Sequence, residues 1–200
     1  MGRDVWVSWV SVVFVLGILA GLALDFRTPE ELVWTVLLGL IFITGVTIGL
    51  DFDSVLRTVR RRTLWSLVMP LATVAGSLTG GLVTHLLTGF SLRYSLAIAA
   101  GMGWYSFTGT YLGNIDPYVG FLGYVSNVLR EVYTYLTYPL LARRWRYSSV
   151  SVGGATTMDT TLPLITSVGG AEVGVMAFVH GMLLTVMVPV LIPAITLLSN

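Results

Sequence analysis

The sequence predicts an all-α, polytopic integral membrane protein. Apolar side chains make up 55% of its 200 residues and charged ones only 10%, and the mean hydropathy is +0.84. A soluble domain carries about 25% charged residues. Several apolar runs also reach the about 20 residues that a helix needs to cross the hydrocarbon core of a bilayer. These observations predict a single transmembrane domain over residues 1–200.

Five apolar runs predict full membrane spans. They lie near residues 5–24, 32–50, 64–87, 120–142 and 173–198. The first follows a short amino-terminal stretch, as a signal peptide would, but it is too long for a typical cleaved one. We therefore expect it to remain as an anchor.

Two further segments, 94–114 and 148–165, are apolar at their flanks but interrupted within. The first contains Gly-Met-Gly-Trp-Tyr-Ser-Phe-Thr-Gly, and the second contains Val-Gly-Gly-Ala-Thr-Thr-Met-Asp-Thr-Thr-Leu-Pro, in which we expect a break, a short helical piece and a stop at Pro163. Irregular backbone at membrane depth must be buried in protein or line a wet cavity. Interrupted segments of this kind are typical of transporter binding sites.

The arginines predict the orientation, because short cytoplasmic loops are enriched in Lys and Arg. Two basic loops are expected, one with Arg57 and residues 60–62, the other with residues 143, 144 and 146. Both lie inside if 94–114 enters and leaves on the outer side. The amino terminus is then cytoplasmic and the carboxyl terminus external. The two interrupted segments enter from opposite faces, which suggests an inverted repeat.

Pairs of glycines four residues apart occur in each of the first three predicted spans. They are Gly17 and Gly21, Gly45 and Gly49, and Gly76 and Gly80. Small residues at this spacing let membrane helices approach closely. We expect them to serve packing within the chain rather than a dimer interface.

Two adjacent charges lie in the middle of the predicted span 120–142. Glu131 is about 11 residues, or roughly 16 Å at 1.5 Å per residue, from either end, which is too far for its carboxylate to reach water. A single charge at the centre costs about 2.5–3.5 kcal/mol. Glu131 shares its helix face with Asn127 and Tyr135, whereas Arg130 points about 100° away. These charges either neutralise neighbours within the bundle or bind a solute, and intramembrane charges are functional by default.

Asp159 is the other ionisable residue that its apolar context places inside. Its carboxylate and the hydroxyls of Thr156, Thr157 and Thr160 can hold a cation, while a helix start offers N–H groups to an anion. A zwitterion needs both. The alternatives are that Asp159 caps a helix or pairs with Arg130.

His180, Trp104 and Tyr105 each have two possible roles. His180 relays protons or is a hydrogen-bonded packing residue, the second being the commoner role of a lone histidine, and His85 is expected near the interface. Trp104 and Tyr105 line a substrate path or pack within the bundle.

The composition excludes several function classes. The chain has no Cys, so disulfides, thiolate metal sites and thiol nucleophiles are excluded, and a net charge of +1 gives no reason to expect nucleic acid. We expect no metal and no cofactor. An intramembrane aspartyl protease needs a second Asp after Gly-x-Gly, where this chain has Trp104. We therefore expect a transporter rather than an enzyme, with a channel or a structural membrane subunit as the alternatives.

Several strings together resemble the LysO-type lysine exporter family over roughly residues 35–195. They are Gly-Trp-Tyr-Ser at 103–106, Ser-Asn-Val-Leu-Arg-Glu at 126–131, Gly-Gly-Ala-Thr-Thr-Met-Asp-Thr-Thr-Leu-Pro at 153–163 and His-Gly at 180–181. In that family a Glu and an Asp in these contexts are needed for export, and they match Glu131 and Asp159. The resemblance implies export of L-lysine and lysine analogues across the cell membrane, in exchange for protons.

Family members similar to this chain carry further transmembrane segments ahead of the matched region. The resemblance therefore implies that the short form works alone, as a homodimer, or with a small membrane partner subunit.

Cation-for-proton exchange also follows from the residues themselves. Two carboxylates in a low-dielectric cavity repel each other, so at least one would readily take up a proton. The ammonium groups of lysine would then meet Glu131 and Asp159, and its carboxylate would meet Arg130 or the N–H groups of an interrupted helix. The alternative is a sodium-coupled transporter of another small amino acid or organic ion, with Asp159 and its neighbouring threonines as ligands.

Overall fold

The computed structural model describes residues 52–198 as a continuous chain, preceded by separate helical positions between residues 12 and 50. The predicted spans 5–24 and 32–50, with the glycine pairs inside them, lie outside the continuous described part. Side chains are described from Val68 onward. Every regular element between residues 52 and 198 is a helix, so the all-α prediction is confirmed.

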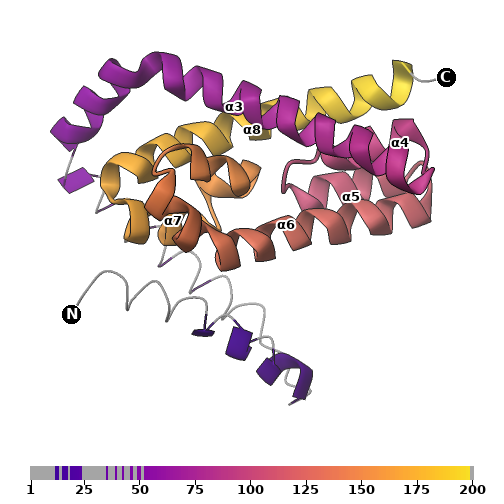
Figure 1. Cartoon of the computed structure of the whole chain (residues 1–200), viewed down its shortest axis with the longest axis horizontal. Coiled ribbons are helices and arrows are strands. Elements are labelled where there is room, and N and C mark those ends of the chain that lie inside the picture. Colours follow the sequence, from indigo (N-terminus) through magenta and orange to yellow (C-terminus); the bar gives the residue numbers. More distant parts are fainter. Residues whose placement is uncertain are drawn as a thin grey trace.

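Three long helices frame the molecule. They are α3 (Phe52–Thr88), α6 (Pro117–Arg144) and α8 (Ala171–Leu198). Helices α3 and α8 pack against each other, and the shorter elements lie between this pair and α6 (Figure 1). Within the described residues, Val68–Thr88 and Ala171–Leu197 are long and apolar enough to cross a membrane.

Helix α3 begins earlier than the sequence suggested. The cluster Arg57 and 60–62, expected in a loop, lies within the first half of this helix, so the loop prediction is wrong. No Gly or Pro occurs between residues 52 and 69, and Arg and Leu are good helix formers. The chain therefore has no local reason to break before Pro70.

Segment 94–114 forms two short helices, α4 (Leu92–Ala99) and α5 (Tyr105–Gly113). We call the residues between them, 100–104, the first break. Met102 has φ +46° and Gly103 φ +99°, and this left-handed backbone turns the chain back on itself. In Figure 1, α4 runs from the end of α3 toward the middle of the molecule and α5 returns to the same end.

Helix α5 packs closely against α6 through glycines. A Cβ at Gly120 would collide with the Gly113 backbone, and one at Gly109 would lie 2.9 Å from Tyr124 Cβ. Gly76 and Gly80 were expected to pack within the chain. In the described part of the molecule, however, an added Cβ at either has no neighbour within 4 Å. The close helix contact is therefore made by a different glycine pair.

Segment 148–165 forms two 3₁₀ turns, η1 (Ser148–Val152) and η2 (Gly154–Met158), followed by helix α7 (Leu162–Gly169). We call residues 153–161 the second break. Pro163, expected to stop a helix, instead lies in the first turn of α7. Proline is tolerated there because the first-turn N–H groups have no intrahelical acceptor.

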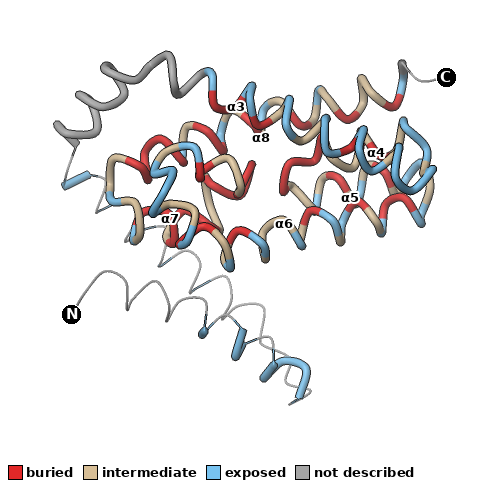
Figure 2. Tube along the Cα trace, viewed as in Figure 1, coloured by how far each residue is buried: buried red, intermediate tan, exposed pale blue. Residues whose placement is uncertain are grey.

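The buried side chains form two clusters, and one of them includes residues of both breaks, Met102 and Ala155. One gathers around Tyr138, Ile165 and Met176, and the other around Met102 and Leu184. Figure 2 shows buried segments along both breaks, whereas the outward sides of α3 and α6 are exposed. The breaks therefore lie in the interior of the bundle.

Candidate functional site

The two breaks meet in the middle of the molecule. The Ala155 N–H donates a hydrogen bond to the Met102 carbonyl oxygen at 2.8 Å. Gly154 has φ +64°, and a Cβ on it would overlap that carbonyl. A Cβ on Gly103 would lie 3.0 Å from the Gly153 carbonyl oxygen. The glycines at 103, 153 and 154 are therefore needed for this close crossing.

Asn127 of α6 fixes the first break. Its Oδ1 accepts a hydrogen bond of 2.6 Å from the Gly103 N–H, and its Nδ2 donates to the Ile98 carbonyl at 3.2 Å. The side chain is only 4% exposed. Asn127 thus holds the first break in place from α6, and it also lines the cavity between α3, α4 and α6.

Arg130 fixes the second break. Its Nε and one terminal nitrogen donate to the carbonyl oxygens of Val152 and Ser151, both at 2.9 Å, and the other terminal nitrogen donates to Ser77 Oγ at 2.8 Å. Arg130 therefore bonds to these three groups and does not form the ion pair with Asp159 that was one expectation. The guanidinium group holds the carbonyl end of η1 and joins it to α3.

Glu131 and Asp159 come together on the other side of α6. The two carboxyl groups interact electrostatically, and both lie close to the Thr160 side chain. The Thr160 N–H donates to Asp159 Oδ1 at 2.6 Å, while the Tyr135 hydroxyl donates to the Thr160 carbonyl oxygen at 2.6 Å. The Tyr105 and Tyr135 hydroxyls interact electrostatically with both carboxylates. We call Glu131, Asp159, Thr160, Tyr105 and Tyr135 the carboxylate cluster.

A small pocket opens beside the carboxylate cluster. Its volume is about 60 Å³, and its lining joins both breaks to α8; the lining residues are Gly103, Trp104, Tyr105, Ala155, Thr156, Met158, Asp159, Thr160 and Thr185. The buried Thr160 Oγ1 lies beside the Glu131 and Asp159 carboxyl groups. The pocket therefore offers a carboxylate and a neighbouring hydroxyl to a small cationic group.

The carboxylate cluster has no resident counter-ion among the described side chains. Within residues 68–198 an ion pair forms between Arg146 and Glu172, 3.6 Å apart, at the far end of α6. No described arginine or histidine nitrogen lies within 4 Å of the Glu131 or Asp159 carboxylate oxygens. Two anionic groups in a low-dielectric interior without a partner favour a visiting cation. The same described residues contain no group of three or more His, Cys, Asp or Glu side chains placed to hold a metal ion.

The hydroxyls of Thr156 and Thr157 make other hydrogen bonds, although Thr156 lines the small pocket together with Asp159. Thr156 Oγ1 lies 3.0 Å from the Gly153 carbonyl oxygen, to which it donates. Thr157 Oγ1 donates to the Ala177 carbonyl at 2.8 Å and lies 3.1 Å from His180 Nδ1. Thr157 is fully buried, and its role in binding stays a prediction.

His180 is a hydrogen-bonded packing residue, the commoner of its two readings. Its Nε2 lies 2.9 Å from Thr73 Oγ1 and its Nδ1 faces Thr157, so the ring ties α3 to η2. Thr73 and Ser77 of α3, which contact His180 and Arg130, were not among the residues expected at the site. They lie one helical turn apart on a single face, and that spacing in an apolar span was the available signal.

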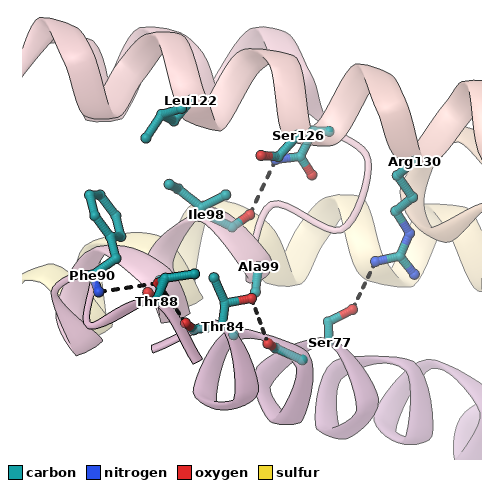
Figure 3. Close-up of a pocket in the computed structure, with 13 residues that line it drawn as sticks. Ser77, Thr84, Thr88, Phe90, Ile98, Ala99, Leu122, Ser126 and Arg130 are labelled. Carbon is teal, nitrogen blue, oxygen red and sulfur yellow. Dashed lines mark hydrogen bonds between the residues drawn. The ribbon is translucent and has the colours of Figure 1, made fainter. Parts of the chain in front are cut away.

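A larger cavity of about 580 Å³ lies between α3, α4 and α6, on the side of α6 that carries Ser126 and Arg130 (Figure 3). Figure 3 shows the Arg130 side chain reaching Ser77 across one end of it. The site therefore has a cationic side facing this cavity and an anionic side facing the small pocket.

Comparisons with known proteins point to one family. The family model described as lysine exporter LysO matches residues 11–196. The chain is 32% identical over 184 residues to the "Lysine exporter LysO" of Escherichia coli, and 30% identical over 189 residues to the "Putative lysine exporter" of Haemophilus influenzae. Each match covers 92% of this chain.

The two relatives differ in length. This chain spans 60% of the Escherichia coli protein and 93% of the Haemophilus influenzae protein. No solved structure matches the chain. Because the family model covers nearly all of the sequence, the chain belongs to the lysine exporter LysO family, a family of membrane transporters.

Proposed function

We propose that this protein exports L-lysine across the cytoplasmic membrane and that Glu131 and Asp159 bind the ammonium groups of the substrate. The observation that carries the proposal is the carboxylate cluster, in which two acidic side chains share one interior site without a described counter-ion within 4 Å. The names of the two relatives support the choice of lysine.

The charges of the site complement those of lysine. The substrate carries two ammonium groups and one carboxylate, while the middle of α6 and the second break offer two carboxylates and one guanidinium group. The Thr160 side chain, which lies beside both carboxyl groups, adds a hydroxyl oxygen for an ammonium N–H. Trp104 and Tyr105 line the pocket next to Asp159 and would shield the bound cation from water.

Proton coupling follows from the same arrangement. Two carboxylates close together in a low-dielectric site cannot both remain ionised without a cation. Protons and the ammonium groups of lysine therefore compete for Glu131 and Asp159. Protonation from the outer side would release lysine, and deprotonation on the inner side would restore the site.

We also propose the membrane orientation that suits this cycle. The arginine-rich start of α3 and the Arg143–Arg144 end of α6 face the cytoplasm, and the two breaks enter from opposite sides. The carboxylate cluster then lies near the middle of the bilayer.

The test is L-lysine flux in proteoliposomes containing the full chain, with proton and sodium gradients imposed separately. We expect flux driven by a pH gradient in the wild type and none in Glu131→Gln, because the amide can neither bind a proton nor balance an ammonium group. Flux that follows a sodium gradient and ignores pH would support sodium coupling at Asp159 instead.

Glu172→Gln provides the matched control. Glu172 receives a hydrogen bond from the Tyr147 hydroxyl at 3.0 Å and lies away from the carboxylate cluster. This variant should retain pH-driven flux. Full activity in Glu131→Gln would refute the proposed role of that carboxylate.

A further inference from the structure

The larger cavity extends from the turn between α3 and α4 to the middle of α6. Thr88 and Phe90 lie at one end and Arg130 at the other, and the volume is about 580 Å³ (Figure 3). Pockets that bind small molecules typically enclose about 300–1,000 Å³. The cavity is therefore large enough to admit an amino acid to the centre of the bundle.

The lining combines small and apolar residues with hydroxyl groups. Gly80 adds no side chain to the wall, and Gly81 packs closely against α4, where an added Cβ would lie 2.8 Å from the Ser95 carbonyl oxygen. Ser95 and Ser126 contribute hydroxyls. Ser95 Oγ is buried and has no hydrogen-bond partner in the described chain. A buried hydroxyl without a partner costs free energy unless a ligand or water supplies one.

Of the described residues that line this cavity, Arg130 carries a charge. Its three hydrogen bonds use one N–H from each guanidinium nitrogen. A guanidinium group has five N–H donors, so one donor on each terminal nitrogen remains. The acceptors already bound are two carbonyls and a hydroxyl, so a carboxylate from a ligand would balance the positive charge.

We propose that the cavity is the chamber through which the substrate reaches the bundle interior, and that Arg130 binds the substrate's α-carboxylate there. The inference rests on the proposed function and adds a specificity: the carrier takes amino acids with a cationic side chain and rejects diamines that lack the carboxylate. The carboxylate cluster alone would accept both classes, because both present two ammonium groups.

A matched pair of variants on α3 tests the path. Gly76 and Gly80 are both exposed, and an added Cβ at either meets no atom within 4 Å, but only Gly80 lines the cavity. Gly80→Leu should abolish most L-lysine flux in proteoliposomes, whereas Gly76→Leu should transport like the wild type. Equal flux in the two variants would overturn the assignment of the chamber, and an inactive wild type would instead overturn the proposed function.

A thiol-labelling experiment tests the carboxylate specificity without transport. The sequence has no Cys, so Ser126→Cys places a single thiol in the cavity, one helical turn from Arg130. L-lysine should slow alkylation of this thiol in the full-length protein, and 1,5-diaminopentane at the same concentration should not. Equal protection by both compounds would overturn the role of Arg130, and protection by neither would overturn the chamber.

Discussion

Replacing Asn127 with Leu should destabilise the protein by loosening the first break. The change keeps the side-chain volume but removes the acceptor of the Gly103 N–H and a donor to the Ile98 carbonyl. An unpaired buried N–H costs about 1–3 kcal/mol and one lost hydrogen bond about 0.5–1.5 kcal/mol. Because the Ile98 carbonyl also accepts from the Gly101 N–H, it is not left unpaired. We therefore expect a loss of about 1.5–4.5 kcal/mol.

The measurement is the free energy of unfolding in mild detergent, obtained by denaturant titration. Asn114→Leu is the control, because Asn114 is exposed at the end of α5 and its backbone bond to Thr110 does not involve the side chain. Hydrogen exchange at Gly103 should accelerate in Asn127→Leu alone. A change of less than about 0.5 kcal/mol in Asn127→Leu, typical of a neutral surface substitution, would refute the reasoning.

Three further predictions concern other contacts. Gly154→Ala should lower the melting temperature more than Gly170→Ala, because both have positive φ but only an alanine at 154 collides with the other break; equal shifts would contradict the close crossing. His180→Gln should reduce thermal stability yet retain pH-driven lysine flux, because its buried ring joins two threonines rather than a proton path; loss of flux in a folded variant would favour a relay. Arg146→Ala should cost less than about 1 kcal/mol in unfolding free energy, as exposed ion pairs with partners such as Glu172 contribute little; a larger loss would show that this contact fastens α6 to α8.

The sequence could predict the long helices because their signal is compositional. The expected span 120–142 lies within α6, and the expected span 173–198 lies within α8. Glycines also marked both breaks, since Gly interrupts helices for local reasons, whereas Pro163 begins α7 instead of ending a helix. The start of α3 was missed because arginines suit a loop and a helix equally, and hydropathy alone does not distinguish the two.

Side-chain partners were harder to predict, because they depend on how distant segments pack. Arg130 and Glu131, about 100° apart on α6, lie in two different environments. Asn127, expected on the face of Glu131, lines the cavity together with Arg130. Nothing local, however, indicated that Arg130 would bond to Ser151, Val152 and Ser77. Likewise, the hydroxyls of Thr156, Thr157 and Thr161 bond within the second break or to α8, whereas the Thr160 hydroxyl lies beside Glu131 and Asp159. Contacts between distant segments decide this difference.

Equilibrium binding of radiolabelled L-lysine to the purified protein as a function of pH tests the shared carboxylate site most directly. If protons and lysine compete for Glu131 and Asp159, affinity should fall as the pH is lowered, and Glu131→Gln and Asp159→Asn should each bind lysine weakly at every pH. Lysine binding that stays tight and equally pH-dependent in both variants would contradict the account.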